Sequence, residues 1–185
     1  MRNLLFFIFL ILSTFSWSQE DSCIICFSHP SGFYKKSFNL TLTTNDSVDL
    51  FYTTDGSKPN SSSTKYKSPI LIDTVKAFRV IAYQKGRSID QETQTYFVNR
   101  DFSMGVISII TNSDNLFGYD RGIYVKGCCA GETPPYSGAN FWRGWEREVN
   151  IEFFEQNGEL AFSQKAGVKI FGGFSKSLPM NSIPL

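Results

Sequence analysis

Short runs of alternating apolar and polar residues, each followed by turn-forming residues, constrain this chain more than any other feature. Residues 38–43, 49–54 and 76–83 have this pattern, and the pair Asp55-Gly56 follows the second run. A period of two is typical of strands with one buried face, and Asp-Gly suits a turn with positive φ. We therefore expect a compact antiparallel β-sandwich over residues 31–98.

The strand at residues 76–83 shows the period most clearly, because Phe78, Val80 and Ala82 lie on one face. Aromatic residues make up 16% of the chain and Phe alone occurs 18 times, which also favours strands. The formal net charge is +1, without the basic surplus that nucleic-acid binding requires. His29 is the single histidine, which argues against a histidine-rich metal site and a Ser-His-Asp triad.

The N-terminus has the pattern of an export signal. A short positive start at Arg2 precedes an apolar run over residues 4–12, and Ser16 and Ser18 supply small residues for cleavage before Gln19. The alternative is a membrane anchor, but the run is far shorter than the roughly 20 residues that span a bilayer. We expect residues 1–18 to be removed, leaving a secreted or cell-surface protein with no stable membrane span.

The four cysteines are then expected in an oxidising compartment. Cys23 and Cys26 have the spacing of a metal or redox pair, whereas Cys128 and Cys129 are adjacent. Adjacent cysteines rarely bond each other, because their Cα atoms are too close for relaxed disulfide geometry. We favour one or two structural disulfides over a metal site, with a bond between the N-terminal segment at residues 19–30 and the loop at residues 127–131 as one pairing.

Residues 31–98 resemble a known family. The residues on which this resemblance rests are Leu50-Phe-Tyr-Thr-Thr-Asp-Gly-Ser-Lys-Pro59 and Ala77-Phe-Arg-Val-Ile-Ala-Tyr83. The segment is similar to the chitobiase/β-hexosaminidase C-terminal domain family. This resemblance implies an immunoglobulin-like accessory module of secreted bacterial enzymes, without catalysis of its own. A sugar platform would need exposed aromatic rings. The candidates are Tyr34, Tyr66 and Tyr83, for which we expect core packing instead.

We interpret residues 99–103 as a linker and expect a second β-sheet within residues 104–185. The run at 106–110 is apolar enough to predict a buried strand. A second strand is expected within residues 116–125. Residues 146–154 alternate, with Val149, Ile151 and Phe153 on the apolar face, and Asn157-Gly158 predicts a tight hairpin turn after them.

The same region resembles the N-terminal part of the CotH-like kinase family (spore coat protein H), over residues 104–183. The matching runs, in order, are Val106-Ile-Ser-Ile, Asn115-Leu-Phe-Gly-Tyr-Asp-Arg-Gly-Ile-Tyr-Val, Trp145-Glu-Arg-Glu-Val-Asn-Ile-Glu-Phe-Phe-Glu, Asn157-Gly and Ala166-Gly-Val-Lys-Ile-Phe-Gly-Gly-Phe-Ser-Lys-Ser-Leu-Pro179. The resemblance implies a two-lobed, kinase-like fold that transfers phosphate from ATP with a divalent metal. By this resemblance, Lys169, Ser175 and Lys176 are candidate nucleotide-binding residues.

The chain departs from that family near its end. Asn181 stands where relatives carry a lysine, Pro184 interrupts the strand expected next, and the chain ends at Leu185, before the expected metal ligands. We therefore expect a truncated kinase-like sheet with no catalytic residues, no metal site and no cofactor of its own. ATP and Mg²⁺ belong to complete relatives.

The expected fold class is mainly β, an immunoglobulin-like sandwich followed by a partial α+β kinase-like N-lobe sheet. Three functions stay open. The first is a secreted, catalytically inactive protein with these two modules. The second is an extracellular module that binds a polysaccharide or a cell-surface protein. The third is the N-terminal part of an active protein Ser/Thr kinase.

Overall fold

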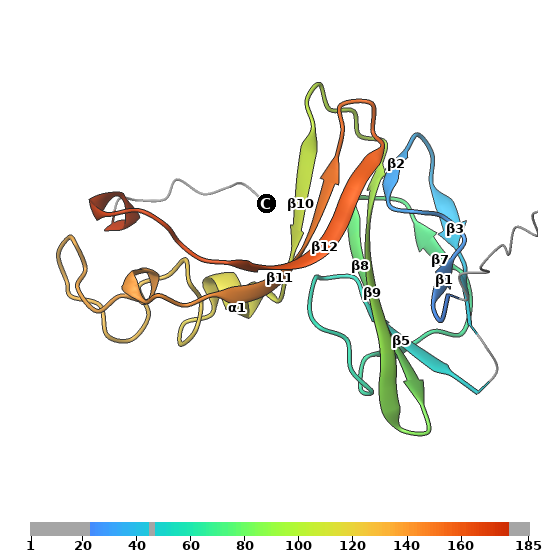
Figure 1. The fold of residues 1–185 in the computed structure, drawn as a ribbon, viewed down its shortest axis with the longest axis horizontal. Helices are drawn as coiled ribbons and strands as arrows, with labels where there is room; N and C mark the ends of the chain where they lie inside the picture. The colour runs from blue at the N-terminus through green and yellow to red at the C-terminus, as the bar shows by residue number, and fades with distance from the viewer. Residues whose placement is uncertain (1–22, 45–46, 178–185) are drawn as a thin grey trace, which may run out of the picture.

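The computed structural model describes residues 23–44 and 47–177, and the protein is mainly β over this range. Three layers of strands stack side by side, followed by a lobe of loops and short helices (Figure 1). The predicted signal peptide at residues 1–18, together with Asn181 and Pro184, lies outside the described residues. The helices in the described part are all short, and none has the length and apolar character to cross a bilayer.

The central layer is a five-stranded sheet. Its strands are, in spatial order, β2 (Gly32–Tyr34), β9 (Arg87–Val98), β8 (Lys76–Gln84), β5 (Asp49–Thr53) and β6 (Thr64–Lys65). β2 runs parallel to β9, and the other neighbours are antiparallel. The predicted strands at 49–54 and 76–83 are confirmed, whereas β2 and β6 carry too few residues to show a period.

Two small antiparallel sheets cover one face of this central sheet. One pairs β1 (Cys26–Phe27) with β4 (Leu42–Thr43), and the other pairs β3 (Phe38–Leu40) with β7 (Ile70–Ile72). Phe78, Val80 and Ala82 point into the core between these layers and are fully buried, as their spacing predicts. Leu40 and Ile72 close the core from the opposite side and are also fully buried. This is the predicted β-sandwich.

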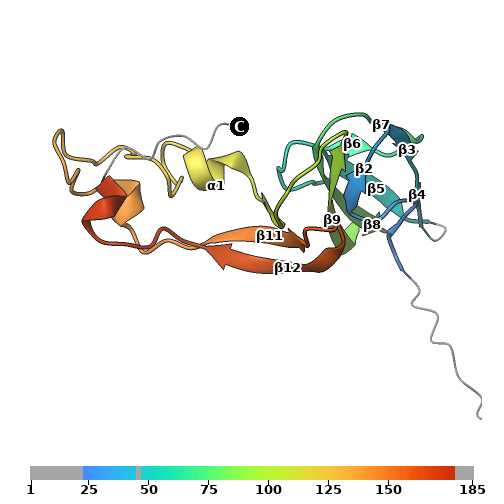
Figure 2. The same cartoon turned by 90° about the horizontal axis from the view of Figure 1, so that it is seen from above.

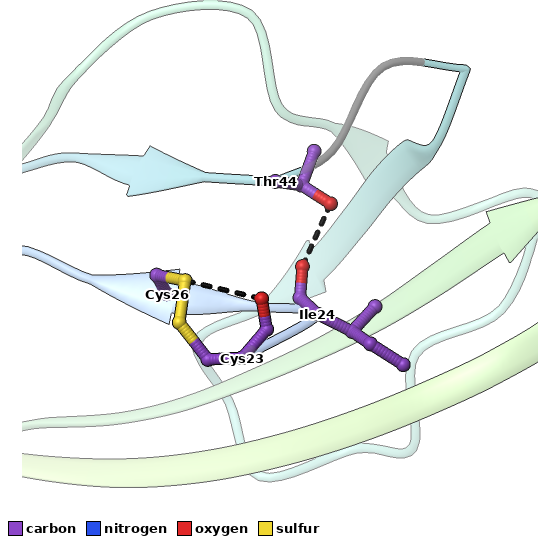
Figure 3. The surroundings of a disulfide bond; sticks show 4 residues. All are labelled: Cys23, Ile24, Cys26 and Thr44. Atoms are coloured by element: carbon purple, nitrogen blue, oxygen red, sulfur yellow. Dashed lines mark hydrogen bonds between the residues drawn. A yellow bond between two sulfur atoms is a disulfide. The ribbon is translucent and has the colours of Figure 1, made fainter. Parts of the chain in front are cut away.

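The disulfide joins Cys23 to Cys26, with 5.6 Å between their Cα atoms (Figure 3). It lies at the start of β1, where the Thr44 hydroxyl donates a hydrogen bond of 2.7 Å to the carbonyl of Ile24. The suggested bond to the loop at 127–131 is therefore wrong. Cys23 finds its partner locally, because one turn of chain brings Cys26 within disulfide reach. Cys128 and Cys129 remain free and exposed.

A three-stranded antiparallel sheet, here called the outer sheet, forms the third layer. It consists of β10 (Val106–Ile110), β11 (Arg147–Phe154) and β12 (Leu160–Val168), in that order. The turn predicted at Asn157-Gly158 is confirmed, since it joins β11 to β12 and Gly158 has φ +86°. Figure 2 shows the β11–β12 hairpin running from the sandwich toward the lobe of short helices.

The outer sheet turns an unexpected face toward the sandwich. Alternation predicts Val149, Ile151 and Phe153 as the core face, yet Glu152 and Phe154 are the residues with no exposed surface. Val149 is buried, but Ile151 and Phe153 are only partly so. The strand turns this way because the outward face of the central sheet carries hydroxyl groups that a carboxyl can bind.

The same arrangement corrects the prediction of a buried strand at 106–110. Ile107 and Ile109 on β10 are 63% and 52% exposed, because they lie on the uncovered side of the outer sheet. Ile110, of the opposite parity, is buried at the strand end. An apolar run in sequence therefore marked an edge strand that is covered on one side only.

The lobe beyond the sheets contains α1 (Ser113–Phe117) and the 3₁₀ helices η1 (Asn140–Trp142) and η2 (Phe174–Ser177). The strand predicted within residues 116–125 is wrong. The Asn112 side chain caps α1 by accepting from the amide of Asp114, so the chain begins a helix there. Ile123 and Tyr124 then donate their amides back to Asn115 and Leu116, which closes a compact loop instead of a strand.

Candidate binding site at the junction of the sheets

The contact between the central and outer sheets is a buried chain of hydrogen bonds. The Thr95 amide donates to the Ser31 hydroxyl over 3.2 Å, and that hydroxyl donates to the Glu152 carboxyl over 2.6 Å. The hydroxyls of Thr95 and Ser108 lie 2.8 Å apart. Burial raises the pKa of Glu152 above its usual value, although hydrogen bonds from Ser31 and Thr95 oppose that rise. The second carboxyl oxygen of Glu152 is buried without a partner.

Aromatic rings close the junction beside this polar chain. Phe154 of β11 meets Phe33 and Phe97 of the central sheet edge-on, with centroid distances of 5.6 and 5.4 Å. At the other end of the junction, Gly56 of the Asp55-Gly56 turn lies against the backbone of Thr111. A Cβ atom added at Gly56 would lie 2.9 Å from the Thr111 carbonyl oxygen. The segment predicted as a linker, 99–103, thus connects two sheets that are packed against each other.

A polar pocket of about 330 Å³ opens where this junction meets the helical lobe. We call it the junction pocket. Its lining residues are Lys58, Asn112, Asp114, Asn115, Arg121, Glu146, Arg147 and Glu148. They come from the sandwich loop after Gly56, from α1 and its following loop, and from the start of β11. The volume is at the lower end of the range for small-molecule sites.

Hydrogen bonds hold the cationic side of the junction pocket in place. The Arg147 guanidinium donates two bonds, of 3.1 and 2.6 Å, to the carbonyl of Arg121. The Arg121 guanidinium donates to the Asn115 side-chain oxygen over 3.2 Å, and the Asn115 amide donates to the Thr111 hydroxyl over 2.8 Å. The pocket wall is therefore tied to the end of β10.

Glu146 lines the same pocket, and the Trp145 ring lies beside it, against Arg147. The Glu146 carboxyl rests on the backbone of Gly167 in β12, where a Cβ would overlap it. The Trp145 ring lies 4.8 Å from the guanidinium of Arg147.

The charges of the junction pocket balance. Lys58, Arg121 and Arg147 line it together with Asp114, Glu146 and Glu148, and two asparagines complete the lining. A polyphosphate would meet three carboxylates here, which disfavours it electrostatically. A neutral polyhydroxyl ligand could instead accept from the cations and donate to the carboxylates, and it would have Trp145 nearby.

The nucleotide-binding candidates lie elsewhere. Lys169 is exposed just after β12, whereas Ser175 and Lys176 belong to η2. The Lys176 ammonium lies 5.7 Å from the centroid of the Trp142 ring. Within the described residues no side-chain hydrogen bond joins these three, and no group of three or more metal-ligating side chains is found. Their nucleotide role stays a prediction.

The three tyrosines considered as a sugar platform on the sandwich contact neighbouring residues of the sandwich. Tyr34 is half-buried against Phe38 at 4.4 Å, and Tyr83 packs edge-on against Phe51. The Tyr66 hydroxyl accepts the amide of Leu42. The expectation of core packing is confirmed for Tyr34 and Tyr66, whereas Tyr83 packs on Phe51 outside the core cluster.

Sequence reasoning missed Glu152 and most of the junction pocket. Lys58 lies far from Asn115 and Arg121 in the sequence, and no local motif joins it to them. Asn112 did carry a usable signal, because Asn followed by an acidic residue two positions later is a helix N-terminus pattern. A helix that begins after Asn112 would have placed Asp114 and Asn115 on the same helical turn.

Comparison with known families supports the sandwich. Residues 29–95 match the family described as the chitobiase/beta-hexosaminidase C-terminal domain. This match confirms the resemblance predicted for residues 31–98 and ends before the outer sheet begins. No curated protein matches the chain. The resemblance of residues 104–183 to CotH-like kinases stays a prediction.

Proposed function

We propose that this protein is an extracellular, non-catalytic module that binds a neutral polysaccharide in the junction pocket. The observation that carries the proposal is the balanced, polar lining of that pocket beside a tryptophan. Its place on a sandwich of chitobiase type is in keeping with a carbohydrate partner. The disulfide at Cys23 and the predicted export signal both agree with a location outside the cytosol.

The test is retention on insoluble glycans. The full chain is mixed with chitin, cellulose or peptidoglycan, and the bound fraction is measured with and without soluble oligosaccharides of the same type. Two variants, Asn115→Ala and Glu146→Gln, should each lower the bound fraction several-fold, because the first removes an amide from the pocket and the second replaces a charged acceptor oxygen by an amide donor. The matched control is Glu132→Gln, which makes the same change of charge on an exposed loop outside the pocket.

The expected result is retention on at least one glycan that competes with its own oligosaccharide and depends on Asn115 and Glu146. A protein that stays in the supernatant with every glycan would refute the proposal. Equal retention of wild type and both variants would refute the assignment to this pocket.

A second candidate is that the outer sheet belongs to a CotH-like kinase domain. The observation in its favour is the order of strands, with β10, the β11–β12 hairpin and the glycine pair after β12 at the expected positions. By the resemblance, Lys169, Ser175 and Lys176 are candidates for the nucleotide side, and we propose that this chain alone does not hold ATP and Mg²⁺. Stabilisation by ATP with magnesium in a thermal unfolding assay, lost in Lys169→Ala, would favour the kinase function instead.

A further inference from the structure

The loop at residues 126–140, here called the cysteine loop, is closed by its own hydrogen bonds. The Asn140 amide donates to the Lys126 carbonyl over 2.9 Å, and the Gly131 amide donates to the Ser137 carbonyl over 2.9 Å. Gly127 and Gly138 adopt positive φ values of 71° and 86°, which suits the tight bends at its two ends. The backbone of the loop is thus set independently of any cross-link.

Cys128 and Cys129 lie inside this closed loop with their sulfur atoms 2.6 Å apart. The two thiols therefore lie side by side, within reach of each other. Both side chains are exposed, so a soluble oxidant can reach them. Cys23 and Cys26 are bonded to each other and do not compete for them.

We propose that Cys128 and Cys129 form a dithiol–disulfide redox pair, which closes to a bond between neighbouring residues on exchange with a disulfide-bearing oxidant. The oxidant is a small-molecule disulfide, such as oxidised glutathione, or the active-site disulfide of a thiol oxidoreductase. This modification is separate from the ligand-binding role of the junction pocket.

The reaction balances as an ordinary thiol–disulfide exchange. One cysteine thiolate attacks a sulfur of the oxidant, forming a mixed disulfide and releasing one oxidant thiolate. The neighbouring thiolate then attacks the cysteine sulfur of that mixed disulfide and releases the second. The two cysteines lose two protons and two electrons, and the oxidant disulfide becomes two thiols.

Geometry makes this bond the more easily reduced of the two disulfides. Consecutive Cα atoms are about 3.8 Å apart, shorter than the 4.4–6.8 Å usual for a disulfide. Cys23 and Cys26, at 5.6 Å, lie within that range. Strained or exposed disulfides are the labile ones, so the pair in the cysteine loop should open first as the reductant increases.

The test uses the full chain with Cys23→Ser and Cys26→Ser, so that two thiols remain. The reduced protein is treated with oxidised glutathione, quenched with iodoacetamide and analysed by intact mass. We expect two carbamidomethyl groups before oxidation and none afterwards, with a mass lower by two hydrogens and no dimer. A dimer, or glutathione retained on the protein, would overturn the proposal.

A companion variant and a peptide map sharpen the result. Cys128→Ser in the same background cannot close the second step, so it should retain one glutathione. In the wild type, trypsin cuts after Lys126 and Arg143 and leaves both cysteines in one peptide. That peptide should carry an internal disulfide after oxidation. A cross-link between it and the peptide of Cys23 would overturn the pairing.

Discussion

Ser31 and Glu152 lie 121 positions apart in the sequence, and they share a buried hydrogen bond of 2.6 Å between the central and outer sheets. Ser31 is 8% exposed and Glu152 has no exposed surface. The hydrogen bonds stabilise the charged form of this carboxyl, whereas its burial disfavours that form. The stability of the junction should therefore respond to pH and to the loss of either partner.

The first prediction concerns pH. Burial raises the pKa of Glu152 in the folded protein above the usual value of 4.5. The folded state thus binds the proton more tightly, and this contribution to stability is complete below 4.5 and lost as the pH rises through the folded-state pKa. In Glu152→Gln this loss cannot occur. The difference in Tm, variant minus wild type, should increase from pH 4.5 to pH 8, and Glu159→Gln, on the exposed turn, should show no such trend.

The second prediction concerns the donor. Ser31→Ala leaves the Glu152 carboxyl without its short hydrogen bond, which should lower the free energy of unfolding by about 1–3 kcal/mol. In the Glu152→Gln background the same change should cost less, since no charge is left unpaired. Urea titration of the four proteins measures the coupling. Equal costs in the two backgrounds would mean that the two residues act independently.

The third prediction concerns the aromatic part of the junction. Phe154→Ala removes a fully buried ring from Phe33 and Phe97, and it should lower the free energy of unfolding by roughly 3–5 kcal/mol. The control is Phe162→Ala on β12, where the ring is 44% exposed. Denaturant midpoints should separate the two variants clearly. Similar losses would show that the contact with the sandwich contributes little.

The fourth prediction concerns the Gly56 turn. Gly56→Ala adds a methyl group at φ +79°, against the Thr111 carbonyl, whereas Gly86→Ala adds one at φ +77° in open space. Both variants incur the backbone strain, on the order of 1 kcal/mol. The extra loss in Gly56→Ala therefore measures the close contact between the sheets. If thermal unfolding gives the same Tm for both variants, that contact is not tight in solution.

The fifth prediction concerns the disulfide at the start of β1. The chain-entropy relation for so short a loop gives about 2 kcal/mol of stabilisation, so Cys23→Ser with Cys26→Ser should lower the unfolding free energy by about that amount. The comparison is Cys128→Ser with Cys129→Ser in reduced protein, which should change stability little because those thiols are exposed. A larger loss in the second variant would reverse the expected roles of the two pairs.

Much of the sandwich could be predicted from sequence because its strands obey one simple rule. β8 places Phe78, Val80 and Ala82 in the core as alternation predicts, although Arg79 and Ile81 on its other face are also buried. The Asp55-Gly56 turn could be predicted equally well from the sequence, because a turn with positive φ favours glycine. Local chemistry was sufficient for these elements.

The outer sheet shows where that rule stops. Alternation in β11 identifies two faces but cannot say which one meets the sandwich, because the answer depends on Ser31 and Thr95 far away in sequence. Glu152 is buried where the Ser31 hydroxyl donates to it and the Thr95 amide in turn donates to Ser31. The junction pocket was unpredictable for the same reason, as Lys58 and Arg121 meet only after the sheets have stacked.

The stacking of the two sheets also has a consequence for how the protein can change over generations. A sandwich that offers Ser31, Gly56 and Thr95 to a neighbouring sheet cannot be exchanged freely for another of the same family. Substitutions at Glu152 should be inherited together with compensating substitutions at Ser31, and bulkier side chains at Gly56 should occur alongside altered backbone paths at Thr111. Recombination should therefore move residues 31–154 as one piece more successfully than it moves the sandwich alone.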